Sequence, residues 1–130
     1  MDHLKIAATD RSPDVDFDFE AGVFSLKGES YPEDASTVFG PIFAALDRFF
    51  SSADIRELRF DFDLIYFNSS SAKALMNMFQ MMENAAGRGT KVVVNWHYAA
   101  DDETMKEFGE DFSEDLENVT FNLVPSSSAA

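Results

Sequence analysis

Residues 58–73 read Leu-Arg-Phe-Asp-Phe-Asp-Leu-Ile-Tyr-Phe-Asn-Ser-Ser-Ser-Ala-Lys, a stretch that predicts a strand running directly into a helix. From Leu58 to Leu64, apolar residues alternate with charged ones, which is the period-two pattern of a strand with one buried face. After Lys73, apolar side chains return at helical spacing, at Leu75, Met78, Phe79 and Met82. The rest of the chain is interpreted as a scaffold that presents the junction between these two elements.

Asn68, Ser69, Ser70 and Ser71 occupy this junction, and two interpretations of them stay open. Their side-chain oxygens are suited to accept hydrogen bonds from the unpaired N–H groups of a first helical turn, so an ordinary N-cap explains them. A hydroxyl held at a helix N-terminus is also a position where phosphorylation places a dianion beside oriented N–H groups.

Composition limits the classes of partner. The 130 residues predict a single domain, taken as residues 1–124, with 14 phenylalanines and six methionines available for its core. The net charge of -14 repels phosphate backbones and anionic lipids, so neither nucleic acid nor membrane is expected as a partner. The chain contains no cysteine, and its N-terminal residues lack the apolar core of a signal peptide, so a soluble cytoplasmic protein is expected.

The other segments predict alternating strands and helices around residues 58–73. Residues 3–8 form a short strand or a loose arm, and residues 15–26 form a hairpin with a Gly-containing turn. Residues 28–34 read as a loop before a helix that begins or bends near Gly40 and Pro41. The remaining segments are a helix at about 70–86, a strand at 91–96 covered on both faces, a helix from 101 to 112, a strand at 119–123 and a disordered tail at 125–130.

This order predicts an α/β fold with a small mixed sheet. The hairpin supplies antiparallel pairing, and the later strands pair in parallel through helical crossovers. About three helices are expected to cover the sheet.

No catalytic, metal or cofactor site is expected from the residues themselves. His97 ends a strand without a serine or cysteine in nucleophile context, and the alternating aspartates at 14, 16 and 18 lack a loop that wraps an ion. Tyr31 and Pro32, next to several acids, are either a docking surface or a helix-entry turn. Met76 lies off the apolar stripe of its helix, so its thioether is either exposed at an adaptable binding surface or fills an irregular gap in the core.

Three segments together resemble the SiaC family of bacterial biofilm-regulation phosphoproteins. They are residues 28–34 with Phe39 and Gly40, residues 64–73, and residues 96–98, and the similarity extends from about residue 15 to residue 124. The resemblance implies a STAS-like fold, similar to that of anti-anti-sigma factors, and a partner-switching role without catalysis.

The resemblance also implies the functional residues. The family's acceptor threonine aligns with Ser69, and Ser70 and Ser71 are chemically identical alternatives. The partner-binding surface is expected to comprise Asn68, Ser70, Lys73, Tyr31, Pro32, Glu33 and Met76. Whether Trp96, His97 and Tyr98 belong to the core or to an interface is left open.

The implied partners are a histidine-kinase-like protein Ser/Thr kinase, a PP2C-type phosphatase and a diguanylate cyclase. The unphosphorylated form is expected to bind and activate the cyclase, which raises cyclic-di-GMP. An anti-anti-sigma factor that binds an anti-sigma kinase uses the same fold and the same switch, and it is the alternative. An effector pull-down distinguishes the two.

Overall fold

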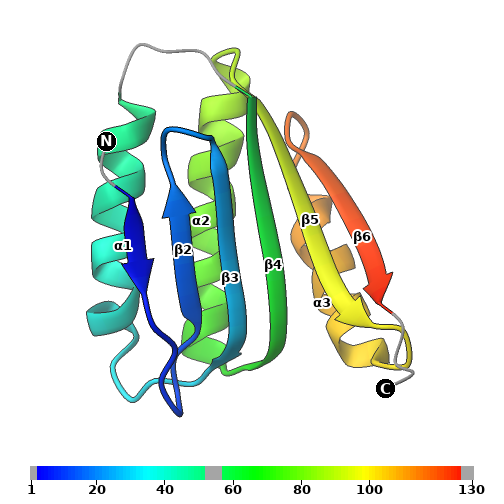
Figure 1. The fold of residues 1–130 in the computed structure, drawn as a ribbon. Helices are drawn as coiled ribbons and strands as arrows, with labels where there is room; N and C mark the ends of the chain where they lie inside the picture. The colour runs from blue at the N-terminus through cyan, green and yellow to red at the C-terminus, as the bar shows by residue number, and fades with distance from the viewer. Residues whose placement is uncertain (1–2, 52–56, 127–130) are drawn as a thin grey trace.

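The structure, a computed structural model, describes residues 3–51 and 57–126. Within these ranges the chain forms six strands: β1 (Leu4–Ile6), β2 (Asp14–Asp18), β3 (Val23–Ser30), β4 (Glu57–Phe67), β5 (Lys91–Ala99) and β6 (Thr120–Ser126). Three helices join the later strands: α1 (Ala35–Phe50), α2 (Ser69–Gly87) and α3 (Glu103–Glu114) (Figure 1). No helix in these ranges is long and apolar enough to cross a membrane.

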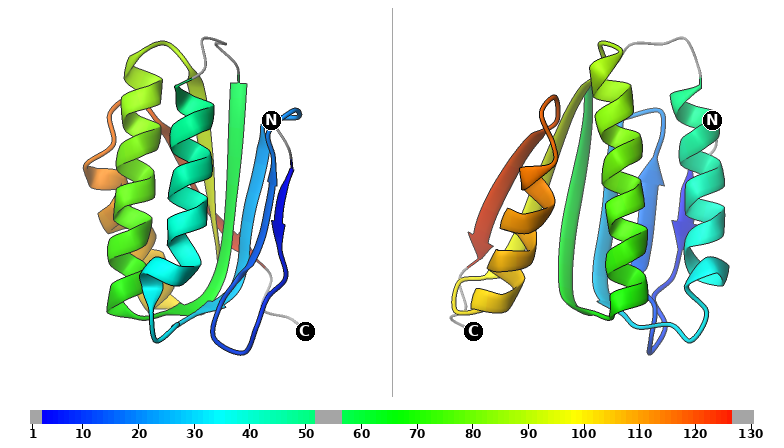
Figure 2. Two further views of the ribbon diagram at one scale, coloured as in Figure 1. Left: turned by 90° about the vertical axis from the view of Figure 1, so that its left-hand side faces the viewer. Right: turned by 180° about the vertical axis from the view of Figure 1, so that it is seen from behind.

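The strands form one sheet in the order β1-β2-β3-β4-β5-β6. The pairs β1–β2 and β2–β3 are antiparallel, and the pairs from β3 to β6 are parallel, with a helix between the two strands of each parallel pair. All three helices lie on one face of the sheet (Figure 2). The predicted mixed α/β sheet is therefore confirmed, and no helix of the described residues lies on its other face.

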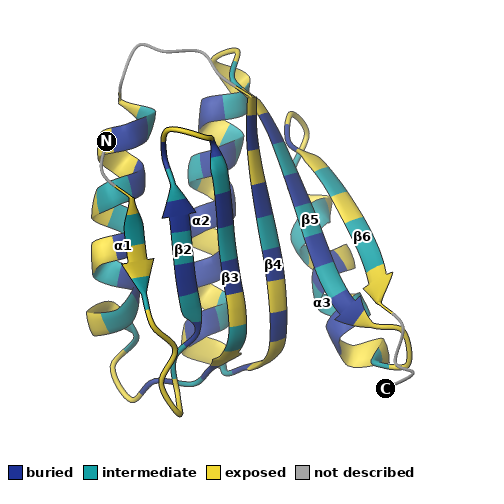
Figure 3. Ribbon diagram, viewed as in Figure 1, coloured by how far each residue is buried: buried dark blue, intermediate teal, exposed yellow. Residues whose placement is uncertain are grey.

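Strand β5 is the main correction to the predicted fold. Its run of valines predicted burial on both faces, but burial alternates along the strand: Val92, Val94 and Trp96 are buried, and His97 is half-buried. Figure 3 looks onto the face without helices, where buried residues alternate with half-buried and exposed ones on the central strands. The described helices cover only one face of the sheet, so the valine run does not indicate burial on both faces. It reflects the position of β5 inside the sheet, between β4 and β6.

Aromatic rings fill the space between the sheet and the helices. Phe24 stacks on Phe60 with ring centroids 4.4 Å apart, and Phe62 meets Phe79 of α2 edge-on at 5.1 Å. Trp96 is 1% exposed, and its indole N–H donates to the carbonyl oxygen of Met105 at 3.0 Å, which ties β5 to α3. The question left open for Trp96 and Tyr98 is settled, because both side chains are buried in the core.

Of the two alternatives predicted for α1, a start near Gly40 is wrong, because the helix begins at Ala35. The Asp34 carboxylate is the reason, because it accepts hydrogen bonds from the backbone N–H of Ser36 at 3.1 Å and from the hydroxyl of Thr37 at 2.9 Å. The hydrogen bonds from Ser36 and Thr37 lower the pKa of Asp34. Pro41 lies inside the helix.

Two predicted boundaries are wrong. Residues 28–30 were assigned to a loop, but they continue β3 and pair with β4 as far as Phe67. The disordered tail was placed at 125–130, but Pro125 and Ser126 are paired in β6, and the Ser126 hydroxyl donates to the carbonyl oxygen of Tyr98 at 3.0 Å. Proline is tolerated there because β6 is an edge strand. Residues 127–130 of the predicted tail lie outside the described ranges.

Candidate functional site

Asn68 is the N-cap of α2, as the sequence predicted. Its side-chain oxygen accepts from the backbone N–H of Ser71 at 2.9 Å, and its carbonyl oxygen accepts from Ala72 at 2.9 Å. Its own N–H donates to the carbonyl oxygen of Ser30 at 3.0 Å, so the end of β3 fixes the start of the helix. The backbone N–H groups of Ser69 and Ser70 donate no hydrogen bond to an acceptor in the described part of the chain.

The structure separates the three serines that the sequence left equivalent. Ser69 and Ser70 are exposed, whereas Ser71 is completely buried. The hydroxyls of Ser71 and Ser30 form a hydrogen bond 2.8 Å long, and Ser30 is also completely buried. An enzyme that modifies this turn therefore reaches Ser69 and Ser70 but not Ser71, which is a correction to the third alternative.

The buried hydroxyl pair is expected to stabilise the start of α2. Ser30→Ala or Ser71→Ala alone should lower the free energy of unfolding by about 1–2 kcal/mol, because the remaining hydroxyl is left buried without its partner. Removing both hydroxyls should cost less than the sum of the single changes. Urea unfolding of the four proteins measures this coupling, and strictly additive costs would contradict it.

Two large apolar residues are exposed beside the serines, at a register shift in β4. Gly28 pairs with Leu64 and Glu29 pairs with Tyr66, so Ile65 is an extra residue in β4. Such bulges redirect side chains and often occur next to functional sites. The alternation of β4 already turns Ile65 away from the core, and this residue is 70% exposed, whereas the shift leaves Tyr66 51% exposed where the alternation would bury it. Both residues lie within the predicted functional segment, but neither is among the predicted partner-binding residues. The sequence signal for their exposure is the unbroken apolar run from Leu64 to Phe67 after a regular alternation.

We define the switch surface as Ile65, Tyr66, Ser69, Ser70 and Lys73. All five residues are exposed, and they follow one another from the end of β4 into the first turns of α2. Lys73 lies one helical turn after Ser69 on the same side of the helix. Met76, also predicted for the site, is 54% exposed one turn further along α2. The switch surface combines apolar side chains, two hydroxyls and one cation.

The predicted loop residues at the end of β3 differ in accessibility. Tyr31 is half-buried, and its ring lies 5.9 Å from that of Tyr66 in an edge-on arrangement. Glu33 is exposed and accepts from Arg11 at 2.8 Å. Pro32 is buried, so its side chain supports the loop rather than offering a contact, which corrects the prediction for this residue.

His97 lies on the sheet face without helices, away from the serines. Its Nε2 is 3.1 Å from the Asp61 carboxylate, which also accepts from Asn95 at 3.1 Å and from Arg59 at 3.0 Å. Burial would raise the pKa of Asp61, but the hydrogen bonds from His97 and Asn95 and the charge of Arg59 outweigh it and hold the pKa below its ordinary value of 3.8. Among the described residues, no three His, Cys, Asp or Glu side chains gather as metal ligands do.

The lowered pKa of Asp61 predicts a pH dependence of stability. Because the folded-state pKa lies below the unfolded value of 3.8, this carboxylate stabilises the fold above that pH, and the contribution is lost as the pH falls through the folded-state pKa. Asp61→Asn should therefore be destabilising near neutral pH, and its difference from the wild type should shrink between about pH 5 and pH 2. Urea unfolding against pH measures this, with Asp63→Asn as control on the same strand. A difference independent of pH would refute the assignment.

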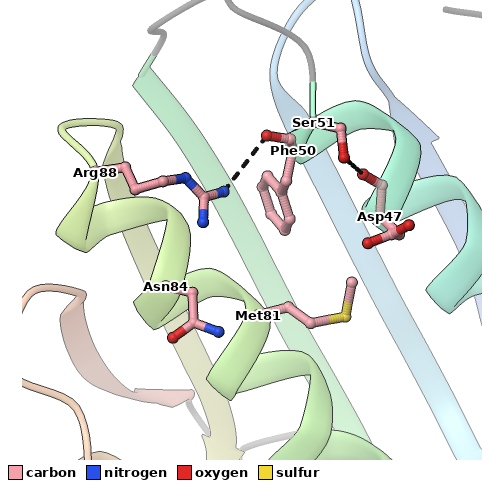
Figure 4. Close-up of a pocket in the computed structure, with 6 residues that line it drawn as sticks. All are labelled: Asp47, Phe50, Ser51, Met81, Asn84 and Arg88. Atoms are coloured by element: carbon pink, nitrogen blue, oxygen red, sulfur yellow. Dashed lines mark hydrogen bonds between the residues drawn. The ribbon is translucent and has the colours of Figure 1, made fainter.

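A polar hollow of about 450 Å³ lies at the other end of α2, between its last turns and the last turns of α1. Figure 4 shows its lining, in which the Arg88 guanidinium donates to the carbonyl oxygen of Phe50 at 3.4 Å. The Ser51 hydroxyl donates to the carbonyl oxygen of Asp47 at 2.7 Å. Since α2 rises about 1.5 Å per residue, the eight residues from Lys73 to Met81 separate this hollow from the switch surface by about 12 Å along the helix.

Comparisons with known proteins point to one family. The family model described as SiaC family regulatory phosphoprotein matches residues 6–126. Apo-SiaC from Pseudomonas aeruginosa matches with a TM-score of 0.87 and 35% sequence identity over 95% of this chain and 99% of that chain. A chain in the crystal structure of the diguanylate cyclase SiaD in complex with its activator SiaC, from the same organism, matches with a TM-score of 0.89 and 34% identity over the same shares. An uncharacterized protein of Pseudomonas aeruginosa (strain UCBPP-PA14) is 36% identical over 115 residues, 88% of this chain and 90% of that protein. The resemblance read from the sequence is confirmed.

Proposed function

This chain belongs to the SiaC family of regulatory phosphoproteins, and we propose that it is a non-catalytic partner-switching protein whose unphosphorylated form binds and activates a diguanylate cyclase. The observation that carries the proposal is the match, over nearly the whole of both chains, to a structure of SiaD in complex with its activator SiaC. The anti-sigma alternative has no comparable observation in its favour.

The switch surface supports docking of a protein. Soluble proteins seldom expose several large apolar side chains together unless they bind something there. Ile65 and Tyr66 are both more than half exposed, and the bulge keeps Tyr66 out of the core, where the alternation of β4 would place it. Tyrosine is also among the residues that dominate the energy of protein interfaces. A cyclase that covers this surface buries Ser69 and Ser70 at the same time.

Ser69 is the proposed phosphate acceptor, with Ser70 as the alternative. Both hydroxyls are exposed at the first turn of α2, where unpaired N–H groups and the helix dipole favour an anion. Lys73, one turn further along, supplies a positive charge within reach of a phosphoryl group on Ser69. The alignment with the family's acceptor threonine favours Ser69 over Ser70.

Phosphorylation is proposed to prevent docking without unfolding the domain. The phosphoryl group adds about -1.5 to -2 charges and three strong acceptor oxygens at the centre of the switch surface. A partner that covers it must remove water from this dianion, and a penalty of about 1.4 kcal/mol already weakens binding tenfold. The helix N-terminus accommodates the charge within the fold, so the change is confined to the surface.

Two enzymes would set the phosphorylation state. A histidine-kinase-like Ser/Thr kinase would transfer the γ-phosphoryl group of ATP to the serine oxygen and release ADP, with the hydroxyl proton passing to a base of the kinase. A PP2C-type phosphatase would restore the hydroxyl by hydrolysis, with inorganic phosphate as the second product. The exposure of Ser69 and Ser70 supports access by both enzymes.

The proposal is tested by adding the purified, unphosphorylated chain to full-length diguanylate cyclase from its own organism, with SiaD of Pseudomonas aeruginosa as a second cyclase. We expect complex formation and faster synthesis of cyclic-di-GMP from GTP. Tyr66→Ala should weaken both effects, because it removes an exposed aromatic side chain from the docking surface. A folded protein that neither binds nor activates either cyclase would refute the proposed function.

A further inference from the structure

Met76 carries the most exposed thioether in the described part of the chain. It is 54% exposed on α2, whereas Met78, Met82 and Met105 are at most 5% exposed and belong to the core. Met81 is half-buried and lines the polar hollow between α1 and α2. The chain contains no cysteine, so methionine is its only sulfur-containing residue type. An oxidant in the solvent therefore reaches Met76 before the other described methionines.

Met76 lies between the switch surface and an apolar hollow. It follows Lys73 by three residues, so the two side chains are neighbours on the same side of α2. Together with Phe79, Phe108 and Phe112 it lines a hollow of about 400 Å³ between α2 and α3, which lie on the same face of the sheet (Figure 2, right). A partner that covers Lys73 therefore contacts the Met76 thioether or its immediate surroundings.

Hydrogen peroxide oxidises a thioether by transferring one oxygen atom. A sulfur lone pair forms the S–O bond, the O–O bond breaks, and the departing hydroxide takes the proton of the transferred oxygen and leaves as water. Sulfur loses two electrons and the peroxide gains them. The product is methionine sulfoxide, which is polar and chiral. Methionine sulfoxide reductases restore the thioether, with two thiols supplying the electrons and the oxygen leaving as water.

A sulfoxide at position 76 changes the surface of the protein and leaves the core intact. Because the Met76 side chain is exposed, the added oxygen stays in water and needs no partner within the fold. The same oxygen on Met78 or Met82 would place an unpaired polar group among core side chains. A partner that covers the oxidised Met76 must remove water from the S–O dipole and bury it beside apolar surface, which opposes binding.

We infer that Met76 is a reversible oxidation site, at which hydrogen peroxide or a related peroxide forms a sulfoxide that weakens docking of the cyclase. The effect on docking rests on the proposed function, whereas the exposure of Met76 is a property of the free chain. This control is distinct from phosphorylation, because it adds no charge and acts on α2 about two turns after Ser69.

The first test maps the oxidation without a cyclase. The folded full chain is treated with dilute hydrogen peroxide, digested with trypsin and analysed by mass spectrometry, in which fragment ions of residues 74–88 assign the oxygen to single methionines. We expect Met76 to react at least about tenfold faster than Met78 and Met82, because buried thioethers react only after a local opening. In urea the three rates should converge. Equal rates in the folded chain overturn the inference.

The second test measures docking of the wild type and two variants before and after peroxide treatment, once catalase has removed the peroxide. Met76→Leu keeps an apolar side chain of similar volume but forms no sulfoxide, and Met81→Leu is the matched control on the same helix. We expect treatment to weaken binding of the full-length cyclase at least about tenfold in the wild type and in Met81→Leu, but not in Met76→Leu. Methionine sulfoxide reductases should restore the binding. An oxidised wild type that binds with unchanged affinity, or an equal loss in Met76→Leu, overturns the effect on docking.

The two tests separate this inference from the proposed function. If no untreated protein binds a cyclase, the proposed function fails and the effect on docking fails with it, while the mapping still decides whether Met76 is the oxidation site. Urea unfolding of the treated wild type completes the design. We expect the same midpoint as for the untreated protein, and a lower midpoint would show that buried methionines had reacted, which contradicts the selectivity for Met76.

Discussion

Replacing Ser69 by glutamate is expected to weaken binding to the diguanylate cyclase by at least about tenfold while the fold is retained. The substitution places a carboxylate on an exposed turn between Tyr66 and Lys73, at the centre of the proposed contact. Covering that charge with a partner removes water from it, and the partner must also approach a chain with a net charge of -14. The enzymatically phosphorylated protein should show a larger effect, because phosphate carries more charge than glutamate.

The stability of the same variant distinguishes a switch from simple damage. A negative charge in the first turn of α2 interacts favourably with the helix dipole, so Ser69→Glu should unfold at the same denaturant concentration as the wild type or at a slightly higher one. Binding is measured by isothermal titration with the full-length cyclase and stability by urea unfolding. Ser69→Ala is the matched control, because it removes the acceptor and adds no charge, and it should bind as the wild type does.

Two outcomes would contradict the switch at this residue. Wild-type affinity of both Ser69→Glu and the phosphorylated protein would show that a charge at this position does not oppose docking. Loss of binding in Ser69→Ala as well would show that the hydroxyl contributes to the contact directly. Ser70→Glu tests the alternative acceptor, and a larger effect there would move the phosphorylation site by one residue.

Much of the fold could be predicted from local patterns. Alternation from Leu58 to Leu64 predicted β4, and the order of strands and helices predicted a mixed sheet with parallel crossovers. The coverage of β5 could not be predicted, because a valine run arises both in strands covered on two faces and in central strands covered on one face. A start of α1 near Gly40 was one alternative because Pro41 suggested a break or a bend, whereas the Asp34 cap begins the helix five residues earlier, at Ala35.

The site was predictable in position but not in detail. The Asn68 cap and the start of α2 follow from residue types whose preferences are local. The difference in burial between Ser69 and Ser71 depends on Ser30. Ser30 lies 41 residues before Ser71 and becomes its neighbour only when β3 and β4 pair. The exposure of Tyr66 depends on a register shift between those same strands. Both features arise from tertiary pairing. No local pattern reveals the first, and the apolar run from Leu64 to Phe67, which breaks the alternation, is a local sign of the second.

The close packing of α3 on the sheet depends on Gly109, a residue that the sequence patterns did not single out. A Cβ at this position would lie 2.6 Å from Leu123 Cδ2, 2.6 Å from Trp96 Cδ1 and 2.9 Å from Trp96 Nε1. The tip of Leu123 can move aside. The Trp96 ring cannot do so easily, because it donates to the carbonyl oxygen of Met105 and is 1% exposed. Only a glycine therefore lets α3 approach β5 this closely.

Gly109→Ala should accordingly lower the free energy of unfolding. Overpacking a core costs about 1–3 kcal/mol, and we expect a cost near the upper end of this range. This cost exceeds the gain of up to about 1 kcal/mol in helix propensity. Gly87→Ala is the matched control, since its Cβ would meet only Asn118 Nδ2 at an ordinary 3.7 Å and should not destabilise the fold. Urea unfolding followed by circular dichroism gives both values, and fluorescence of the single tryptophan reports locally on the strained ring. If Gly109→Ala were as stable as the wild type, α3 would be free to shift away from β5, and its close approach would not depend on the glycine.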